Sequence, residues 1–220
     1  MVTAIVPAYN EADYIGETLA ALHAARCFTD IVVVDDGSWD DTGRIASQYA
    51  RVIRHPQNRG KGDAIATGMA HVTTPFVCWV DADLGQTAIH IRHLLPPVLR
   101  GEADMTIAQF PPSRRKEGFG FLVWTASQGI YHLTGQRMAA PLSGQRAMRK
   151  DIVASLRSYP RRFGLEVGVT VHLLRSGYRL QEVPLPLSHR RLGRNWRGMV
   201  HRGREWCDVV RTLWELSRQT

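Results

Sequence analysis

The chain has 220 residues, 44% hydrophobic and 22% charged, an ordinary composition for a protein with one large core. No apolar run approaches the roughly 18 to 20 residues that cross a bilayer, and the first residues lack the basic and then apolar pattern of a leader peptide. We therefore expect a cytoplasmic protein. Three widely spaced cysteines, Cys27, Cys78 and Cys207, form no CxxC pair, which argues against a disulfide framework and a zinc site.

The positive charge is spread unevenly along the chain. The formal net charge is +8, and residues 190–220 contain eight arginines against three acidic residues, a net +5. An excess of this size favours an anionic partner.

The first half of the chain alternates strand and helix patterns. Strands are expected at 3–9, 30–38, 51–55 and 76–80, with helices at 11–25, 40–50 and 60–72. This alternation predicts a parallel sheet covered by helices.

The second half is less regular. A strand is expected at 103–110, a basic loop with glycines at 111–120, helices at 121–135 and 166–177, and an extended segment at 178–190.

The tail has the pattern of an amphipathic helix, with apolar residues at steps of three and four from Trp196 to Trp214 and arginines on the remaining face. Two interpretations stay open. The apolar stripe packs on its own protein or on a second copy in a homodimer, or it lies at an anionic membrane surface, at the inner face of the membrane. A nucleic-acid partner is not expected, because no recognised binding module accompanies the basic tail.

The stretch "FVCWVDADLG" (76–85) carries a hydrophobic strand directly into Asp81 and Asp83. Acids at a strand end often only cap the next turn. However, polar clusters also follow the expected strands at 7–10 and 35–37. The carboxyl ends of parallel strands meet at one edge of a sheet, where ligands collect, so we expect a binding site there.

Two common phosphate-binding motifs are missing. The turn after the first strand reads "PAYNEAD" and not G-x-G-x-x-G, which disfavours a dinucleotide site. Lys61 does not belong to a Walker A motif, because His55 replaces the first glycine and Gly62 follows the lysine. A site with several acids suits Mg²⁺ or Mn²⁺ shared with the diphosphate of a nucleotide sugar.

Five motifs resemble, in order and spacing, the family 2 glycosyltransferases of the GT-A fold: "IVPAYNEADYI", "IVVVDDGSWDDT", "NRGKGDAIATGM", "WVDADLG" and "LSGQRAMRK". Residues 163–190 are similar to the dolichyl-phosphate mannose synthase and glucosyl-3-phosphoglycerate synthase branches. The resemblance implies an α/β fold with a Rossmann-like, mostly parallel central sheet flanked by helices. That GT-A domain would span residues 1–190, followed by a basic amphipathic C-terminal helix at 191–220.

The resemblance also implies roles for residues around the nucleotide. The base and ribose pocket would be lined by Pro7, Ala8, Tyr9 and Glu11. Asp36 would accept a hydrogen bond from the base, and Lys61 would lie beside the nucleotide.

The metal site follows from the same resemblance. Asp81 would contact the ribose or a metal-bound water, and Asp83 would bind Mg²⁺ or Mn²⁺ directly and so belong to the catalytic machinery. Gly85 stands where the polyprenol-phosphate branch often has a glutamine ligand. His189 is therefore the candidate for a second ligand, its alternative being an exposed histidine of the tail.

Sugar transfer leaves negative charge on the departing nucleoside diphosphate, which the metal and nearby cations must stabilise. Arg114, Arg115 and Lys116 in the basic loop are candidates to close over it, although a solvated charge run is an equal alternative.

The acceptor side has three candidate residues. Glu166, expected at a helix start, is the candidate general base for a hydroxyl acceptor, whereas a phosphate acceptor needs no base. Gln145 and Arg146 are expected near the acceptor.

We therefore interpret the chain as a metal-dependent glycosyltransferase. It would move one sugar from a UDP- or GDP-sugar, with inversion, to a polyprenyl phosphate or a small soluble acceptor. A nucleotidyltransferase is the first alternative, although the first turn lacks its glycine-rich signature. A non-catalytic nucleotide-sugar-binding protein is the second.

Overall fold

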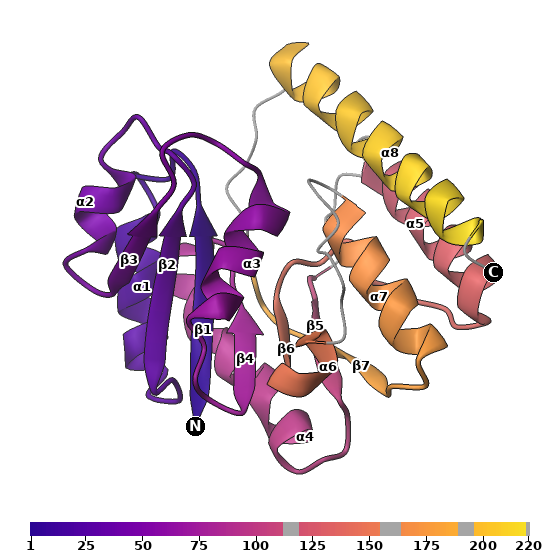
Figure 1. Ribbon diagram of the computed structural model, residues 1–220, viewed down its shortest axis with the longest axis horizontal. Helices are drawn as coiled ribbons and strands as arrows, with labels where there is room; N and C mark the ends of the chain where they lie inside the picture. The colour runs from indigo at the N-terminus through magenta and orange to yellow at the C-terminus, as the bar shows by residue number, and fades with distance from the viewer. Residues whose placement is uncertain (112–118, 155–163, 189–195, 219–220) are drawn as a thin grey trace.

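The computed structural model describes residues 1–111, 119–154, 164–188 and 196–218. Its centre is a seven-stranded sheet in the order β3-β2-β1-β4-β6-β5-β7 (Figure 1). Neighbouring strands are parallel except at β6, which is antiparallel to both β4 and β5. The predicted α/β fold with a mostly parallel sheet is confirmed. The strands are β1 (Val2–Ala8), β2 (Asp30–Asp35), β3 (Arg51–Arg54), β4 (Phe76–Trp79), β5 (Met105–Gln109), β6 (Arg146–Arg149) and β7 (Leu180–Pro184).

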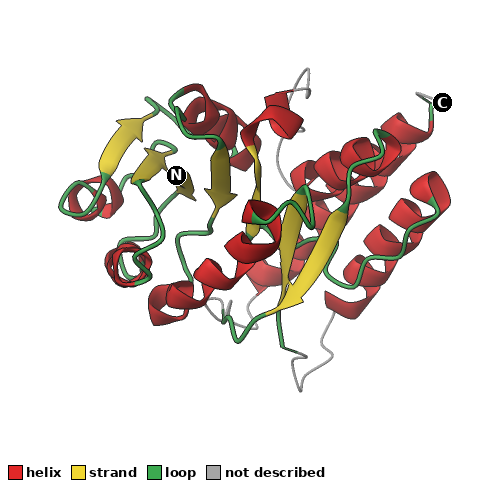
Figure 2. Ribbon diagram, turned by 90° about the horizontal axis from the view of Figure 1, so that it is seen from below, coloured by secondary structure: helices red, strands yellow, loops and turns green. Residues whose placement is uncertain are grey.

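Helices cover both faces of the sheet, as Figure 2 shows from below. One face carries α1, α2 and the 3₁₀ helix η1, and the other carries α3, α5 and α7, with α8 packed against α5 and α7. The helices are α1 (Ile15–Ala24), α2 (Thr42–Ala46), α3 (Lys61–Ala70), η1 (Gly85–Leu94), α4 (Leu95–Leu99), α5 (Phe119–Thr134), α6 (Lys150–Ala154), α7 (Leu165–Arg175) and α8 (Trp196–Ser217).

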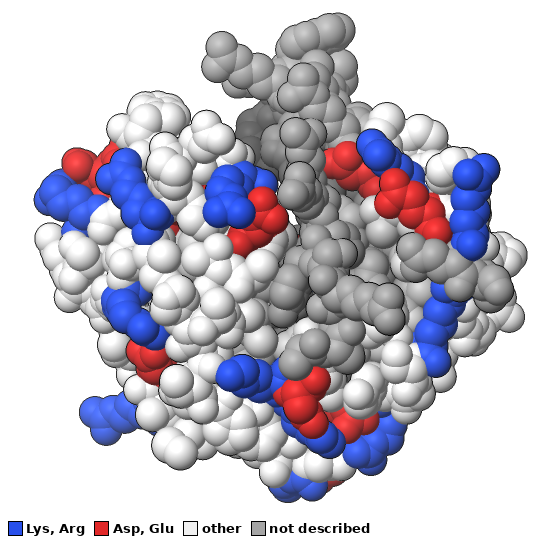
Figure 3. Space-filling model, viewed as in Figure 1, with Lys and Arg blue, Asp and Glu red and all other residues white. Residues whose placement is uncertain are grey.

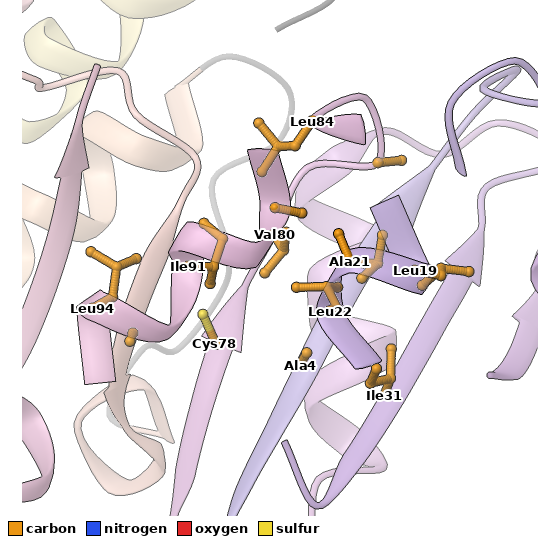
Figure 4. Close-up of a cluster of buried hydrophobic side chains, with 14 of the residues drawn as sticks. Ala4, Leu19, Ala21, Leu22, Ile31, Cys78, Val80, Leu84, Ile91 and Leu94 are labelled. Atoms are coloured by element: carbon orange, nitrogen blue, oxygen red, sulfur yellow. The ribbon is translucent and has the colours of Figure 1, made fainter. Parts of the chain in front are cut away.

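The core lies on both faces of the sheet. On one face, Leu19 and Leu22 of α1 and Ile91 and Leu94 of η1 gather beside Cys78 of β4 (Figure 4). A second cluster on the other face draws buried aliphatic residues from α3, α5, α7 and α8. Because the central strands are covered on both sides, they read as continuous hydrophobic runs. Their carboxyl ends are consequently held in fixed positions.

The observed elements differ from the sequence prediction mainly at their boundaries. The helix predicted at 11–25 begins at Ile15, because the Glu11 carbonyl accepts the backbone N–H groups of Tyr14 and Ile15 and closes a turn first. The helix predicted at 40–50 is regular only over α2. Neither η1 nor α4 was predicted. Most of the basic loop at 111–120 and the domain boundary near residue 190 lie outside the described residues.

Helix α8 docks on the protein through its C-terminal half. Val209 is fully buried, and Leu213 and Leu216 pack on the same core cluster. A Cβ atom at Gly129 of α5 would lie 2.3 Å from Leu213, so the two helices approach closely only because glycine stands there. The packing interpretation of the tail is therefore correct for this half. Within the described ranges, no helix is long and apolar enough to span a bilayer.

Candidate active site

The loops after β1 and β2 meet at the carboxyl edge of the sheet and are tied together. The backbone N–H of Asn10 donates to Ser38 Oγ at 3.0 Å, and that of Trp39 donates to Asn10 Oδ1 at 3.0 Å. Asn10 has a φ of 57°, a left-handed conformation that asparagine tolerates better than most residues. The pair of loops is thereby fixed as one wall of the site.

The predicted pocket residues lie along this wall. Tyr9 is exposed, Pro7 and Glu11 are half-buried, and Ala8 is buried with its carbonyl accepting the Asp36 N–H at 2.8 Å. The backbone of Glu11 is anchored by Thr42 Oγ1 at 2.8 Å. Tyr9 is 43% exposed and Trp39 is 81% exposed, so both aromatic residues of this wall are accessible to a ligand.

The Asp36 carboxylate has different partners from the nucleobase that the sequence predicted. Its Oδ1 accepts the backbone N–H of Arg59 at 2.9 Å and faces His55 Nδ1 at 2.6 Å, while its Oδ2 accepts the Gly60 N–H at 2.7 Å. A buried carboxylate needs such donors, and the loop entering α3 supplies them. Asp36 therefore holds the loop that delivers Lys61, and its contact with a nucleobase stays a prediction.

Lys61 joins two carboxylates. Its Nζ lies 2.7 Å from Asp81 Oδ1 and 2.8 Å from Glu166 Oε1, and its side chain is 31% exposed. Burial alone would lower the pKa of Lys61, but the charges of Asp81 and Glu166 and their hydrogen bonds raise it above its ordinary value. Lys61 is consequently a permanent cation at neutral pH and cannot serve as a base.

Gln145 fixes the orientation of Asp81. Its Oε1 accepts the Asp81 backbone N–H at 2.8 Å, and its Nε2 donates to Asp81 Oδ2. Gln145 is fully buried and contacts Asp81, and its predicted place near the acceptor stays a prediction. The antiparallel register explains the contact: Trp79 pairs with Arg146, which brings the residues before β6 beside the end of β4.

Gly144 makes room for this cluster. A Cβ atom there would lie 2.4 Å from Lys61 Nζ and 2.8 Å from Asp81 Oδ2. Any side chain at residue 144 would therefore displace the ammonium or the carboxylate. The sequence motif "LSGQR" contains this glycine, but its spacing alone does not reveal what it faces.

Arg146 is also fully buried, and its predicted position on the acceptor side stays a prediction. Its guanidinium donates to the carbonyl oxygens of Ser143 and Pro141 and to Thr170 Oγ1, the last at 2.9 Å. Burial lowers the pKa of Arg146 to about 10, and the nearby Glu166 carboxylate partly offsets this. Arg146 thus remains charged at neutral pH and supports the loop before Gln145.

Glu166 lies in the first turn of α7 and is almost buried. The helix N-terminus favours a carboxylate there, as predicted from the sequence. Thr170, which receives the Arg146 hydrogen bond, donates its own hydroxyl to the Glu166 carbonyl at 2.7 Å. Glu166 and Asp81, which are 85 residues apart in the chain, are thus brought to one cation.

Asp83 lies two residues beyond Asp81 in a turn that α1 holds. Thr18 Oγ1 donates to the Ala82 carbonyl at 2.7 Å and accepts the Gly85 N–H at 2.9 Å. Its hydroxyl therefore holds the backbone on both sides of Asp83. This role of Thr18 was not predicted, since nothing in its helix sequence marks it. Among the described residues, no group of three or more His, Cys, Asp or Glu side chains is arranged to hold a metal ion.

Four predicted site residues lie outside the described residues: Arg114, Arg115 and Lys116 of the basic loop, and His189 of the metal site. Their roles stay predictions.

The chain matches the family model "Glycosyl transferase family 2" over residues 3–156. An uncharacterised protein of Methanocaldococcus jannaschii is 32% identical over 195 residues, covering 82% of this chain and 79% of that protein. An undecaprenyl-phosphate mannosyltransferase of Micrococcus luteus is 27% identical over 213 residues, covering 87% and 85%.

The fold is similar to a solved structure as well. Glucosyl-3-phosphoglycerate synthase from Mycobacterium tuberculosis, crystallised with Mg²⁺ and uridine diphosphate, superposes with a TM-score of 0.84 at 22% identity, covering 98% of this chain and 79% of that chain. The chain belongs to glycosyl transferase family 2. It is an enzyme of the glycosyltransferase class, and the predicted family and enzyme class are confirmed.

Proposed function

We propose that the protein transfers a single sugar from a UDP- or GDP-sugar, with inversion, to an acceptor that is a polyprenyl phosphate or a small soluble molecule. The observation that carries this proposal is the group formed by Asp81, Lys61 and Glu166 at the carboxyl edge of the sheet. Asp81 follows β4, Glu166 lies in the first turn of α7, and the Lys61 ammonium between them joins the two carboxylates. A donor sugar bound beside this group would contact it.

The names of related proteins support both acceptor classes. Relatives include the undecaprenyl-phosphate mannosyltransferase and a dolichyl-phosphate β-glucosyltransferase of Trichomonas vaginalis, which is 40% identical over 102 residues, 40% of this chain and 30% of that protein. The structural neighbour acts in making glucosyl-3-phosphoglycerate. Each of these names includes a phosphate, so a phosphate-bearing acceptor is the class that they share.

A divalent cation fits the chemistry of the residues present. Asp83 offers a hard oxygen ligand, and Lys61 and Gln145 already engage Asp81. With few protein ligands, Mg²⁺ or Mn²⁺ would complete its coordination with the donor diphosphate and water, as such ions commonly do. When bound, the ion would stabilise the charge of the leaving diphosphate. We propose His189 as a further ligand of this ion.

Glu166 takes one of two roles that depend on the acceptor. A hydroxyl acceptor must lose a proton as the new glycosidic bond forms, and Glu166 would accept it. A phosphate acceptor is already an anionic nucleophile near neutral pH. In that case Glu166 would only hold Lys61 in place.

The test is a donor and acceptor matrix. Purified protein is incubated with UDP-glucose or GDP-mannose and Mn²⁺, with either a polyprenyl phosphate in detergent or 3-phosphoglycerate. Released nucleoside diphosphate and the sugar product are measured, and the anomeric configuration of the product is read by NMR. Nucleotide binding without any transfer across a broad panel would instead support the non-catalytic alternative.

A further inference from the structure

His55 is a buried histidine with a polar partner at each ring nitrogen. Its Nδ1 lies 2.6 Å from Asp36 Oδ1, and its Nε2 lies 2.9 Å from Thr67 Oγ1. The residue is only 4% exposed. Because a carboxylate only accepts hydrogen bonds, Nδ1 donates to Asp36, and Nε2 is left to the Thr67 hydroxyl. We call Asp36, His55 and Thr67 the His55 bridge.

The His55 bridge joins three elements near the carboxyl edge of the sheet. Asp36 directly follows β2, His55 directly follows β3, and Thr67 lies within α3. The main chain of His55 is held as well, since its N–H donates to the Asp35 carbonyl at 2.9 Å. The imidazole is therefore fixed to the sheet, and through Thr67 it fixes α3 relative to the sheet.

The start of α3 is anchored through the same bridge. The residue before the helix is Gly60, and no side chain caps the helix there. The anchor comes from outside the segment, because Asp36 accepts the backbone N–H groups of Arg59 and Gly60 at 2.9 Å and 2.7 Å. Gly60 has a φ of 97°, which lets two consecutive N–H groups face one carboxylate. Lys61 is the next residue along the chain.

The other end of α3 is held in a different way. A Cβ atom at Gly68 would lie 2.5 Å from Ile5 Cγ2, so this part of the helix packs directly on β1. Packing therefore sets the distance of Gly68 from the sheet. The N-terminal turn, which carries Lys61, is held by the polar contacts of Asp36.

The place of Lys61 matters because its ammonium is shared. Nζ lies 2.7 Å from Asp81 Oδ1 and 2.8 Å from Glu166 Oε1, so a shift of about 1 Å would break one contact or weaken both. Figure 3 shows basic and acidic side chains of the described residues intermingled across the face in view. On such a surface an anionic donor is positioned by short contacts more than by a broad field of one sign.

We propose that His55 is a positioning residue of the donor site. It orients the Asp36 carboxylate, which holds the residues before α3, and it thereby sets the Lys61 ammonium between Asp81 and Glu166. The burial of His55 keeps it from touching the donor itself. The inference rests on the proposed function, because a nucleotide-sugar donor is the ligand that Lys61 is expected to meet.

The first test is amide hydrogen exchange on the full chain without ligand. His55→Phe keeps a buried ring but removes both hydrogen bonds of the imidazole. The N–H groups of Arg59 and Gly60 are expected to exchange at least about tenfold faster in this variant, because their acceptor is no longer held. The N–H groups of β1 report global opening in the same samples. Unchanged exchange at residues 59 and 60 relative to β1 would overturn the proposal.

Two further variants make this test specific. His71→Phe is the matched control, because His71 is exposed and its Nδ1 lies 2.9 Å from the Thr67 carbonyl oxygen at the other end of α3. It is expected to exchange like wild type at residues 59 and 60, and equally fast exchange in this control would count against the bridge. If His55→Phe does not fold, Thr67→Val carries the same test, with several-fold faster exchange expected at these two residues.

The second test asks whether His55 acts through Lys61. The affinity for UDP or GDP with Mn²⁺ is measured by calorimetry for wild type, His55→Phe, Lys61→Met and the double variant. His55→Phe is expected to weaken binding about tenfold when Lys61 is present, and less than about twofold when Lys61 is already replaced. A merely structural role would give the same loss in both backgrounds, and that result would overturn the proposal.

Failure of the bridge and failure of the proposed function give different results. Faster exchange at residues 59 and 60 in His55→Phe, with no binding of UDP or GDP by wild type, would leave the bridge standing and count against the nucleotide-sugar donor. Nucleotide binding by wild type, with exchange unchanged in His55→Phe, would leave the donor standing and remove the bridge.

Discussion

Removing the Lys61 ammonium should leave the two carboxylates that it joins repelling each other. Lys61→Met keeps much of the length and apolar volume of the side chain but leaves Asp81 and Glu166 without their shared cation. Their side chains are only 22% and 9% exposed, so water can solvate them poorly. We therefore expect the variant to fold but with lower stability at pH 7.

The size of this effect lies between two limits. Losing one partner of an exposed ion pair costs about 1 kcal/mol or less, and losing one from a fully buried pair costs about 3 to 5 kcal/mol. Lys61 is 31% exposed and has two partners, so we expect about 2 kcal/mol. For a domain of this size that corresponds to a melting temperature lower by about 4 to 8 °C.

The pH dependence has a definite sign. The folded-state pKa of Lys61 is raised, so its contribution to stability is fully present below the ordinary lysine pKa of about 10.4 and is lost as the pH rises further. The difference in stability between wild type and Lys61→Met should therefore narrow as the pH rises above about 10.4.

The assay is a double-mutant cycle by urea unfolding. Wild type, Lys61→Met, Asp81→Asn and the double variant are compared, and Lys150→Met serves as a matched control because its ammonium contacts only the Val72 carbonyl among the described residues. The double variant should recover stability relative to Lys61→Met, with a coupling energy of about 1 kcal/mol or more. A coupling within about 0.5 kcal/mol of zero would refute the electrostatic account of this group.

Three further substitutions test the remaining roles. Asp83→Ala should abolish Mn²⁺-dependent nucleotide binding, measured by calorimetry, while leaving the melting temperature near that of wild type; retained binding would remove the metal assignment. Glu166→Gln should lower turnover with a hydroxyl acceptor by about 10²-fold or more while donor affinity stays within a few-fold. Full activity in that variant would indicate a phosphate acceptor. Gly144→Ala should weaken donor binding and destabilise the protein by about 1 to 2 kcal/mol, because the new methyl group meets both Lys61 Nζ and the Asp81 carboxylate; wild-type stability and donor affinity in this variant would contradict that cause.

The sequence was sufficient for the fold because its first half follows local rules. Alternation of hydrophobic runs with amphipathic segments identified β1 to β4 and α1 and α3 within a few residues. The same rules placed Asp81 and Asp83 at the edge of the sheet where loops converge. They missed η1, because its sequence "GQTAIHIRHL" has too few apolar positions to suggest a helix and 3₁₀ helices have little periodic signal.

The sequence was less informative about what each site residue contacts. Asp36 was expected to bind a base, but its hold on the loop before α3 through backbone N–H groups was not predicted, because no side-chain pattern reveals it. Gln145 and Arg146 were expected to face an acceptor together. Adjacent residues of a strand point to opposite faces, so one reaches Asp81 and the other enters the core.

The antiparallel strand β6 is the part of the fold that completes the site. Its pairing with β4 opposes Trp79 and Arg146, and that register sets Gln145 beside Asp81 across a gap of 64 residues in the sequence. A slip of one residue would exchange the two faces, turning Gln145 away from Asp81 and a buried guanidinium toward it. The hydrogen bonds of Arg146 to the loop carbonyls oppose such a slip, because breaking them would leave a buried charge without hydrogen-bond partners. The fully buried Arg146 thus secures the position of Gln145, which orients the Asp81 carboxylate, and the two residues act as one unit.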